Sequence, residues 1–134
     1  MIKATKSKPR TAAAAKPKAL TKRQLPPGLR TAIQAAQDKK AEDIVVLDLR
    51  AAASFTEYFL LMTGMNSRQT AALAETIERD LKAENLRPIG VEGASRGEWI
   101  LMDYGWFLVH VFSPAARDYY ALEKLWGDAP SLTV

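Results

Sequence analysis

The chain has 134 residues, a length that fits one domain with a tail, and it contains no cysteine. The missing cysteines exclude disulfides and thiolate metal sites, and no apolar run approaches the roughly 18 residues of a membrane span. The net charge of +4 is unevenly distributed: residues 1–25 carry eight basic and no acidic residues, and the remainder carries 11 basic and 15 acidic residues. The remainder is therefore acidic, and the composition does not indicate a basic nucleic-acid-binding domain.

Residues 1–28 are predicted to be a basic tail that is disordered when free. They contain few bulky apolar side chains and cannot bury enough surface to offset the entropy of ordering. Pro26-Pro27-Gly28 breaks the chain and marks the start of a folded domain over residues 29–134. We interpret the tail as a nucleic-acid contact; a transit peptide and a solubilising extension are the alternatives. The basic tail residues are Lys3, Lys6, Lys8, Arg10, Lys16, Lys18, Lys22 and Arg23.

The elements of the domain are predicted from apolar periodicity and from chain breakers. Asn66 offers an N-cap for a long helix, and Gly105 marks a tight hairpin. In chain order we expect a helix over 29–40, strands over 43–49 and 58–63, a helix from 66 to about 85, strands over 88–91, 98–104 and 106–112, and a helix from 113 to 127. This order predicts an α/β fold with a mixed sheet of four to five strands flanked by helices.

Both faces of the predicted hairpin are apolar. With the period of two residues, Trp99, Leu101 and Asp103 share one face of the first strand, and Trp106 and His110 share one face of the second. Three helices are few for covering two apolar faces, so an uncovered face that bears Trp99 would mark a partner site. Burial of the same residues beneath the last helix is the alternative.

Catalytic motifs are missing from the sequence. There is no GxSxG, GxxxxGK[ST] or GxGxxG motif, and a single histidine without cysteine does not support a zinc site. That histidine, His110, is interpreted as a structural or interface residue, with a catalytic base as the alternative. Asp48 and Asp103 lie on candidate strands and could bind Mg²⁺ if the strands were neighbours. We therefore predict no catalytic residue, metal or cofactor. A magnesium-dependent nucleotidyltransferase and a general RNA-binding module stay as alternatives.

A series of motifs occurs in order along the domain: Asp43-Ile44-Val45-Val46-Leu47-Asp48-Leu49, Phe55-Thr56-Glu57-Tyr58-Phe59, Thr63-Gly64, Ser67-Arg68-Gln69, Val91-Glu92-Gly93, Trp99-Ile100-Leu101-Met102-Asp103-Tyr104-Gly105, Val109-His110-Val111-Phe112, Arg117, Tyr120 and Leu122-Glu123-Lys124-Leu125-Trp126. Together they resemble the Iojap-like ribosomal silencing factor family (RsfS) over about residues 29–128. Glu57, where the family commonly has Asp, and Met65-Asn66 are small departures.

The resemblance implies a nucleotidyltransferase-like fold without the catalytic site. It implies docking on the large ribosomal subunit at ribosomal protein L-fourteen, which blocks joining with the small subunit and represses translation in starvation. Large-subunit assembly is the alternative. The expected location is the bacterial cytoplasm, or the mitochondrial matrix or a plastid if the tail is a transit peptide.

The acidic domain is expected to meet a basic ribosomal protein, and the tail is expected to contact rRNA. In this interpretation Trp99 is the apolar anchor, Glu92 and Asp103 accept Lys or Arg, and His110 shares a hydrogen bond with the partner. The sequence leaves open whether the free protein is a homodimer. The expected partner-binding residues are Glu92, Trp99, Leu101, Asp103, Tyr104 and His110.

Overall fold

The structure is a computed structural model that describes residues 20–134. The tail residues from Lys3 to Lys18 lie outside the described part, so what is expected of them stays a prediction. No helix within residues 20–134 is long and apolar enough to cross a membrane. The elements are η3 (Lys22–Gln24), α1 (Pro27–Asp38), β1 (Glu42–Asp48), β2 (Tyr58–Thr63), α2 (Ser67–Lys82), β3 (Gly90–Glu92), β4 (Trp99–Asp103), β5 (Phe107–Phe112), α3 (Pro114–Tyr120), α4 (Leu122–Leu125) and β6 (Ser131–Thr133).

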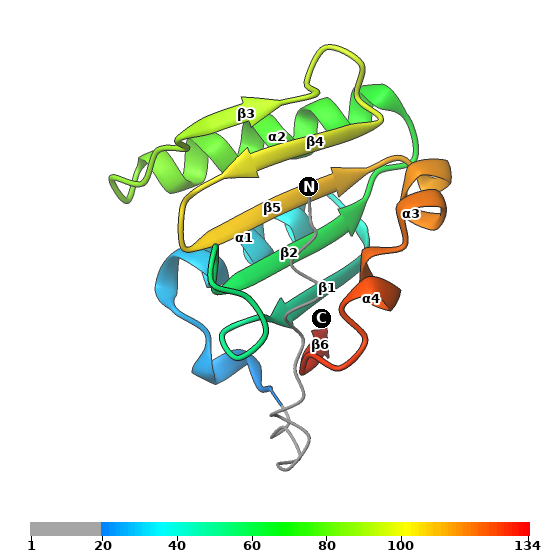
Figure 1. Cartoon of the computed structure of the whole chain (residues 1–134). Helices are drawn as coiled ribbons and strands as arrows, with labels where there is room; N and C mark the ends of the chain where they lie inside the picture. The colour runs from blue at the N-terminus through cyan, green and yellow to red at the C-terminus, as the bar shows by residue number, and fades with distance from the viewer. Residues whose placement is uncertain (1–19) are drawn as a thin grey trace.

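One mixed sheet of six strands has the order β3-β4-β5-β2-β1-β6 (Figure 1). The neighbours β2 and β5 are parallel, and every other neighbouring pair is antiparallel. The predicted α/β class is confirmed, but the prediction of four to five strands is wrong. The additional strand is β6, which pairs with the edge of β1. Three residues carry too little period-two pattern to be recognised as a strand without that neighbour.

Helices α1 and α2 cover one face of the sheet and enclose the larger core with it (Figure 1). Leu20 and Leu25, which precede α1, are buried in the same core. The packed part of the chain therefore begins before the boundary expected at residue 28. Pro27 lies in the first turn of α1. Backbone N–H groups there have no acceptor within the helix, so the missing N–H of proline removes no hydrogen bond. The Pro-Pro-Gly segment thus starts a helix as well as ending the preceding segment.

Short-range capping signals in the sequence have the predicted effect. The side chain of Asn66 accepts a hydrogen bond from the backbone N–H of Gln69 at the start of α2. Ser113 accepts one from the N–H of Ala116 at the start of α3. Gly105 has a φ of 87°, which glycine adopts without strain, in the turn between β4 and β5. These residues fix where the helices and the hairpin begin.

Helices α3 and α4 cover part of the second face, where Leu122 and Trp126 are buried in a smaller core. The single helix expected over 113–127 is divided at Ala121, whose φ of 41° is left-handed. Tyr119, expected on the apolar side of that helix, is 80% exposed, because the helical period does not continue through Ala121. Figure 1 shows α3 and α4 along one side of the sheet. Within the described residues, no helix covers this face of β3, and α3 reaches this face of β4 at Trp99, against which Tyr120 packs.

Candidate partner-binding surface

Four of the expected partner-binding residues gather on the uncovered part of the second face. Trp99, Leu101 and Asp103 alternate along β4, and each is half-buried. Glu92 of β3 pairs with Leu101, so its side chain shares this face, and it is exposed. Leu108 of β5 pairs with Asp103 and is half-buried. We call these five residues the β4 surface.

The indole of Trp99 is held from several sides. Its Nε1–H donates a hydrogen bond to Nδ1 of His110 at 3.1 Å. Its ring lies against Tyr120 and Phe112, with ring centroids 4.4 Å and 5.2 Å away. Tyr120 is 46% exposed and extends the aromatic area from β4 onto α3. Sequence reasoning missed this role of Tyr120 because it placed the residue within one helix over 113–127, whereas α3 ends at Tyr120 in the structure.

His110 lies beneath Trp99 and is only 2% exposed. Its ring also meets Phe59, with centroids 4.5 Å apart. Burial disfavours the charged imidazole, and the nearby charge of Arg117 adds to this effect, so the pKa of His110 is lowered to about 3. The structure therefore corrects the expectation that His110 shares a hydrogen bond with a partner: the bond goes to Trp99 of the same chain.

Tyr104 and Trp106 belong to the helix-covered side of the sheet. Tyr104 is 7% exposed and stacks on Phe107 with centroids 4.9 Å apart. Burial, with a smaller contribution from Glu78, raises the pKa of Tyr104 to about 12. Tyr104 is therefore not available to a partner, which corrects the sequence expectation. Trp106 packs on the same core rather than beside His110, because it lies in the turn before β5, where the strand period does not hold.

Two members of the β4 surface, Glu92 and Asp103, are acidic. Glu92 is exposed. The Oδ1 atom of Asp103 accepts a hydrogen bond from the N–H of Gly105 at 2.8 Å, which orients this carboxylate at the end of β4. Arg96, in the turn before β4, is an exposed basic residue close by in sequence. An apolar centre with mostly carboxylate neighbours is complementary to a basic protein surface.

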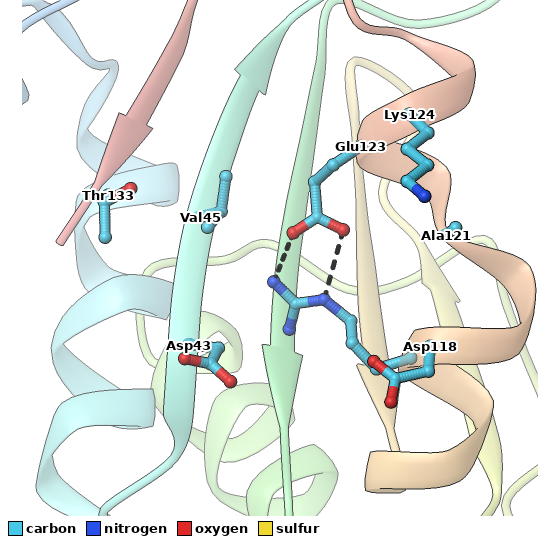
Figure 2. Close-up of a pocket in the computed structure, with 8 residues that line it drawn as sticks. Asp43, Val45, Asp118, Ala121, Glu123, Lys124 and Thr133 are labelled. Carbon is cyan, nitrogen blue, oxygen red and sulfur yellow. Dashed lines mark hydrogen bonds and ion pairs between the residues drawn. The ribbon is translucent and has the colours of Figure 1, made fainter.

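A cavity of about 600 Å³ lies on the same face between β1, β6 and the α3–α4 segment (Figure 2). The carboxylate of Glu123 accepts hydrogen bonds from Nε and Nη2 of Arg117 at 3.2 Å and 2.6 Å. Nη1 of Arg117 donates to Thr63 at 2.8 Å. Burial raises the pKa of Glu123, but its bonds to Arg117 and the charge of Arg117 outweigh burial and lower it. The lining residues are Asp43, Val45, Arg117, Asp118, Ala121, Glu123, Lys124 and Thr133.

Asp48 and Asp103 do not form the magnesium site considered from the sequence. Their strands β1 and β4 are separated by β2 and β5, which places them roughly 14 Å apart at the usual strand spacing. Asp48 pairs with Tyr58 on the helix-covered face, whereas Asp103 lies on the other face. Arg50 donates to both carboxylate oxygens of Asp48 at 3.0 Å and 2.8 Å. Within residues 20–134, no group of three His, Cys, Asp or Glu residues could hold a metal ion.

The fold and the surface define an α/β protein whose mixed six-stranded sheet is closed by two helices on one face and partly open on the other. The sequence matches the family model described as "Ribosomal silencing factor during starvation" (RsfS) over residues 22–134. The chain belongs to this family, which confirms the resemblance seen in its motifs.

Individual relatives agree with this membership. The chain is 42% identical over 104 residues to the ribosomal silencing factor RsfS of Chromobacterium violaceum, covering 77% of this chain and 85% of that protein. It is 40% identical over 102 residues to RsfS of Bacillus subtilis, covering 76% and 86%. A crystal structure of a C. violaceum protein matches with a TM-score of 0.73 at 41% identity, over 75% of this chain and 83% of that one.

A more distant relative is the mouse protein named "Mitochondrial assembly of ribosomal large subunit protein 1". It is 28% identical over 93 residues, which cover 67% of this chain and 41% of that protein. The chain is therefore similar both to bacterial silencing factors and to an organellar protein named for large-subunit assembly.

Proposed function

We propose that the protein binds the large ribosomal subunit through the β4 surface and acts by occupying it, without catalysing a reaction. In this proposal the contact is ribosomal protein L-fourteen, and the bound protein blocks joining of the small subunit sterically. The observation that carries the proposal is the uncovered sheet face with Trp99 at the end nearest α3 and the carboxylates of Glu92 and Asp103 farther along it. The names of the bacterial and mitochondrial relatives support a ribosomal partner.

The physical requirements of such docking are modest. A stable interface buries roughly 800 Å² on each partner, and a few central residues, often Trp or Tyr, supply most of the binding energy. Trp99 and Tyr120 meet this description because their rings pack against each other and are partly exposed. Ribosomal proteins are generally basic, so the net charge of −4 over residues 26–134 would steer the domain toward one.

A second function, assembly of the large subunit, is favoured by the name of the mitochondrial relative. It would use the same surface, but its consequence differs. A silencing factor keeps mature large subunits from joining small subunits, whereas loss of an assembly factor leaves immature large particles. Sedimentation of ribosomal particles from cells with and without the protein distinguishes the two functions.

Trp99→Ala is expected to weaken binding to isolated large subunits by about 30-fold, which corresponds to about 2 kcal/mol for a central aromatic anchor. The physical reason is the loss of the largest apolar side chain on the β4 surface together with its contact to Tyr120. The measurement is co-sedimentation of the protein with purified large and small subunits over a range of protein concentrations.

The matched control is Ile89→Ala, which removes an exposed apolar side chain outside the β4 surface. This variant should bind as the wild type does. Urea unfolding of both variants reports whether they remain folded. Full-strength binding by folded Trp99→Ala, or equal binding of the wild type to both subunits, would contradict the proposed docking.

Deletion of residues 1–19 is expected to weaken large-subunit binding and to flatten its dependence on salt concentration. We propose that the six basic residues in this segment contact rRNA, and each phosphate contact that is lost reduces the slope of log affinity against log salt by about 0.7–0.9. The affinity of the full chain and of the truncated chain is measured at several potassium chloride concentrations. Identical slopes would show that the tail does not contact rRNA.

A further inference from the structure

His110 carries a buried polar group that the fold does not satisfy. Its Nδ1 accepts the indole N–H of Trp99, so the single proton of the neutral ring is on Nε2. That Nε2 atom is buried and has no hydrogen-bond partner among the described residues. A buried N–H without a partner destabilises a folded protein, and such groups in native structures call for an explanation.

The surroundings of His110 would suit a phenylalanine. Its ring meets Phe59 at a steep angle of 64° and lies nearly parallel to Phe112, at 7°. Its strand neighbours are Leu101 and Leu61. A phenyl ring would fill this space without a buried N–H of its own. The one contribution that a phenyl ring could not make is the hydrogen bond to Trp99.

Trp99 needs such a contact because it is only half-buried. Tyr120 and Phe112 pack against the indole at interplanar angles of 46° and 32°, and such ring contacts are less directional than a hydrogen bond. The hydrogen bond to Nδ1 of His110 fixes the Nε1 edge of the indole toward the sheet. An anchor that is already oriented loses less conformational freedom when the partner binds.

We propose that His110 is a positioning residue that holds the Trp99 indole in its partner-binding orientation. This inference rests on the proposed function of the β4 surface. His110 itself is buried and touches no partner; it acts only through Trp99. The presence of a histidine among these aromatic and aliphatic neighbours, with the charge of Arg117 nearby, is then a cost in stability that serves binding, as occurs at functional sites.

The test compares H110F, H110L, W99F and the double variant W99F/H110F with the wild type. H110F is expected to be at least as stable as the wild type in urea at pH 7.5, yet to bind large subunits about fivefold more weakly because the indole is no longer preorganised. H110L should weaken binding in the same direction. In the W99F background, which has no indole donor, H110F should cause no further loss of affinity.

A spectroscopic measurement reports the positioning without ribosomes. The three tryptophans give three indole N–H signals in a ¹H–¹⁵N spectrum, and W99F identifies the signal of Trp99. That signal should move in H110F, whereas those of Trp106 and Trp126 should shift less.

The outcomes separate the two proposals. If the wild type binds large subunits and the folded H110F and H110L bind equally well, the positioning role is refuted and the proposed function stands. An equal loss on adding H110F to the wild type and to W99F would also refute it, because His110 would then act independently of Trp99. If the wild type itself does not bind, the proposed function fails and the positioning role fails with it.

Discussion

Glu123→Gln is expected to lower the free energy of unfolding by about 3 kcal/mol, the lower end of the range for breaking a buried ion pair. The guanidinium of Arg117 has a side chain that is only 9% exposed, and Glu123 is its ion-pair partner. Glutamine keeps the size and one acceptor atom but removes the charge of the ion-pair partner of the buried cation. The Glu123 side chain is 38% exposed, so water reaches the site and keeps the loss from being larger. Urea unfolding monitored by circular dichroism measures the change.

The control for this prediction is the double variant Arg117→Met with Glu123→Leu. Replacing both partners by apolar side chains removes the buried charge itself, so most of the lost stability should return. Lys124→Gln changes a neighbouring charge that is exposed and should alter stability by less than about 0.5 kcal/mol. If Glu123→Gln were as stable as Lys124→Gln, the ion pair would not hold α3 and α4 together.

The Arg117–Glu123 pair also connects stability with the β4 surface. Arg117 lies in α3 and Glu123 in α4, and the left-handed Ala121 separates the two helices. Tyr120, the last residue of α3, packs against Trp99 just before that break. The ion pair bridges the break, so it helps to fix where Tyr120 meets the sheet.

Local signals were sufficient for most of the fold. The N-caps Asn66 and Ser113 and the turn residue Gly105 act on the backbone within a few residues of their own positions. Each could therefore be recognised without knowing the tertiary structure. The same holds for β2, whose apolar run ends at Gly64 and has the predicted bounds of 58–63.

Features that depend on distant contacts could not be predicted in the same way. The strand β6 exists because β1 offers it a free edge, and the left-handed conformation of Ala121 is not one that alanine favours. The alternation along β4 correctly separates Trp99 from Tyr104, but it does not say which face the helices leave open. Whether Trp99 or Tyr104 is accessible depends on which face is covered, and the packing of α1 and α2 covers the face of Tyr104.

The role of His110 needed the structure for another reason. The sequence places it on the same face as Trp99, which suggests a shared surface. In the sheet, however, His110 pairs with Leu101 and the indole of Trp99 bonds to its Nδ1, so one residue is buried and the other is half-exposed. Strand pairing and side-chain direction set this difference, and neither can be read from spacing along the chain.

Acidification from pH 7.5 to pH 5 is expected to destabilise the wild type relative to H110F by about 2 kcal/mol, since each pKa unit corresponds to about 1.4 kcal/mol. Burial lowers the pKa of His110 from its ordinary 6.5 to about 3 in the folded protein. Between these two values the unfolded chain binds a proton that the folded chain does not. Stability must therefore fall as pH falls below 6.5, and the loss continues until the pH approaches 3.

The comparison with H110F isolates this effect because His110 is the only histidine in the chain. Carboxylates such as Glu123, whose pKa is lowered by Arg117, also contribute to acid destabilisation, but they are common to both proteins and cancel in the difference. Urea unfolding at pH 7.5, 6.0 and 5.0 measures the free energy of unfolding of both proteins, with one m-value fitted to all curves. Parallel curves would mean that the imidazole reaches water or gains a proton in the folded state. Such curves would contradict the assignment of His110 as an enclosed, neutral ring that accepts the Trp99 indole N–H, because a protonated Nδ1 cannot accept a hydrogen bond.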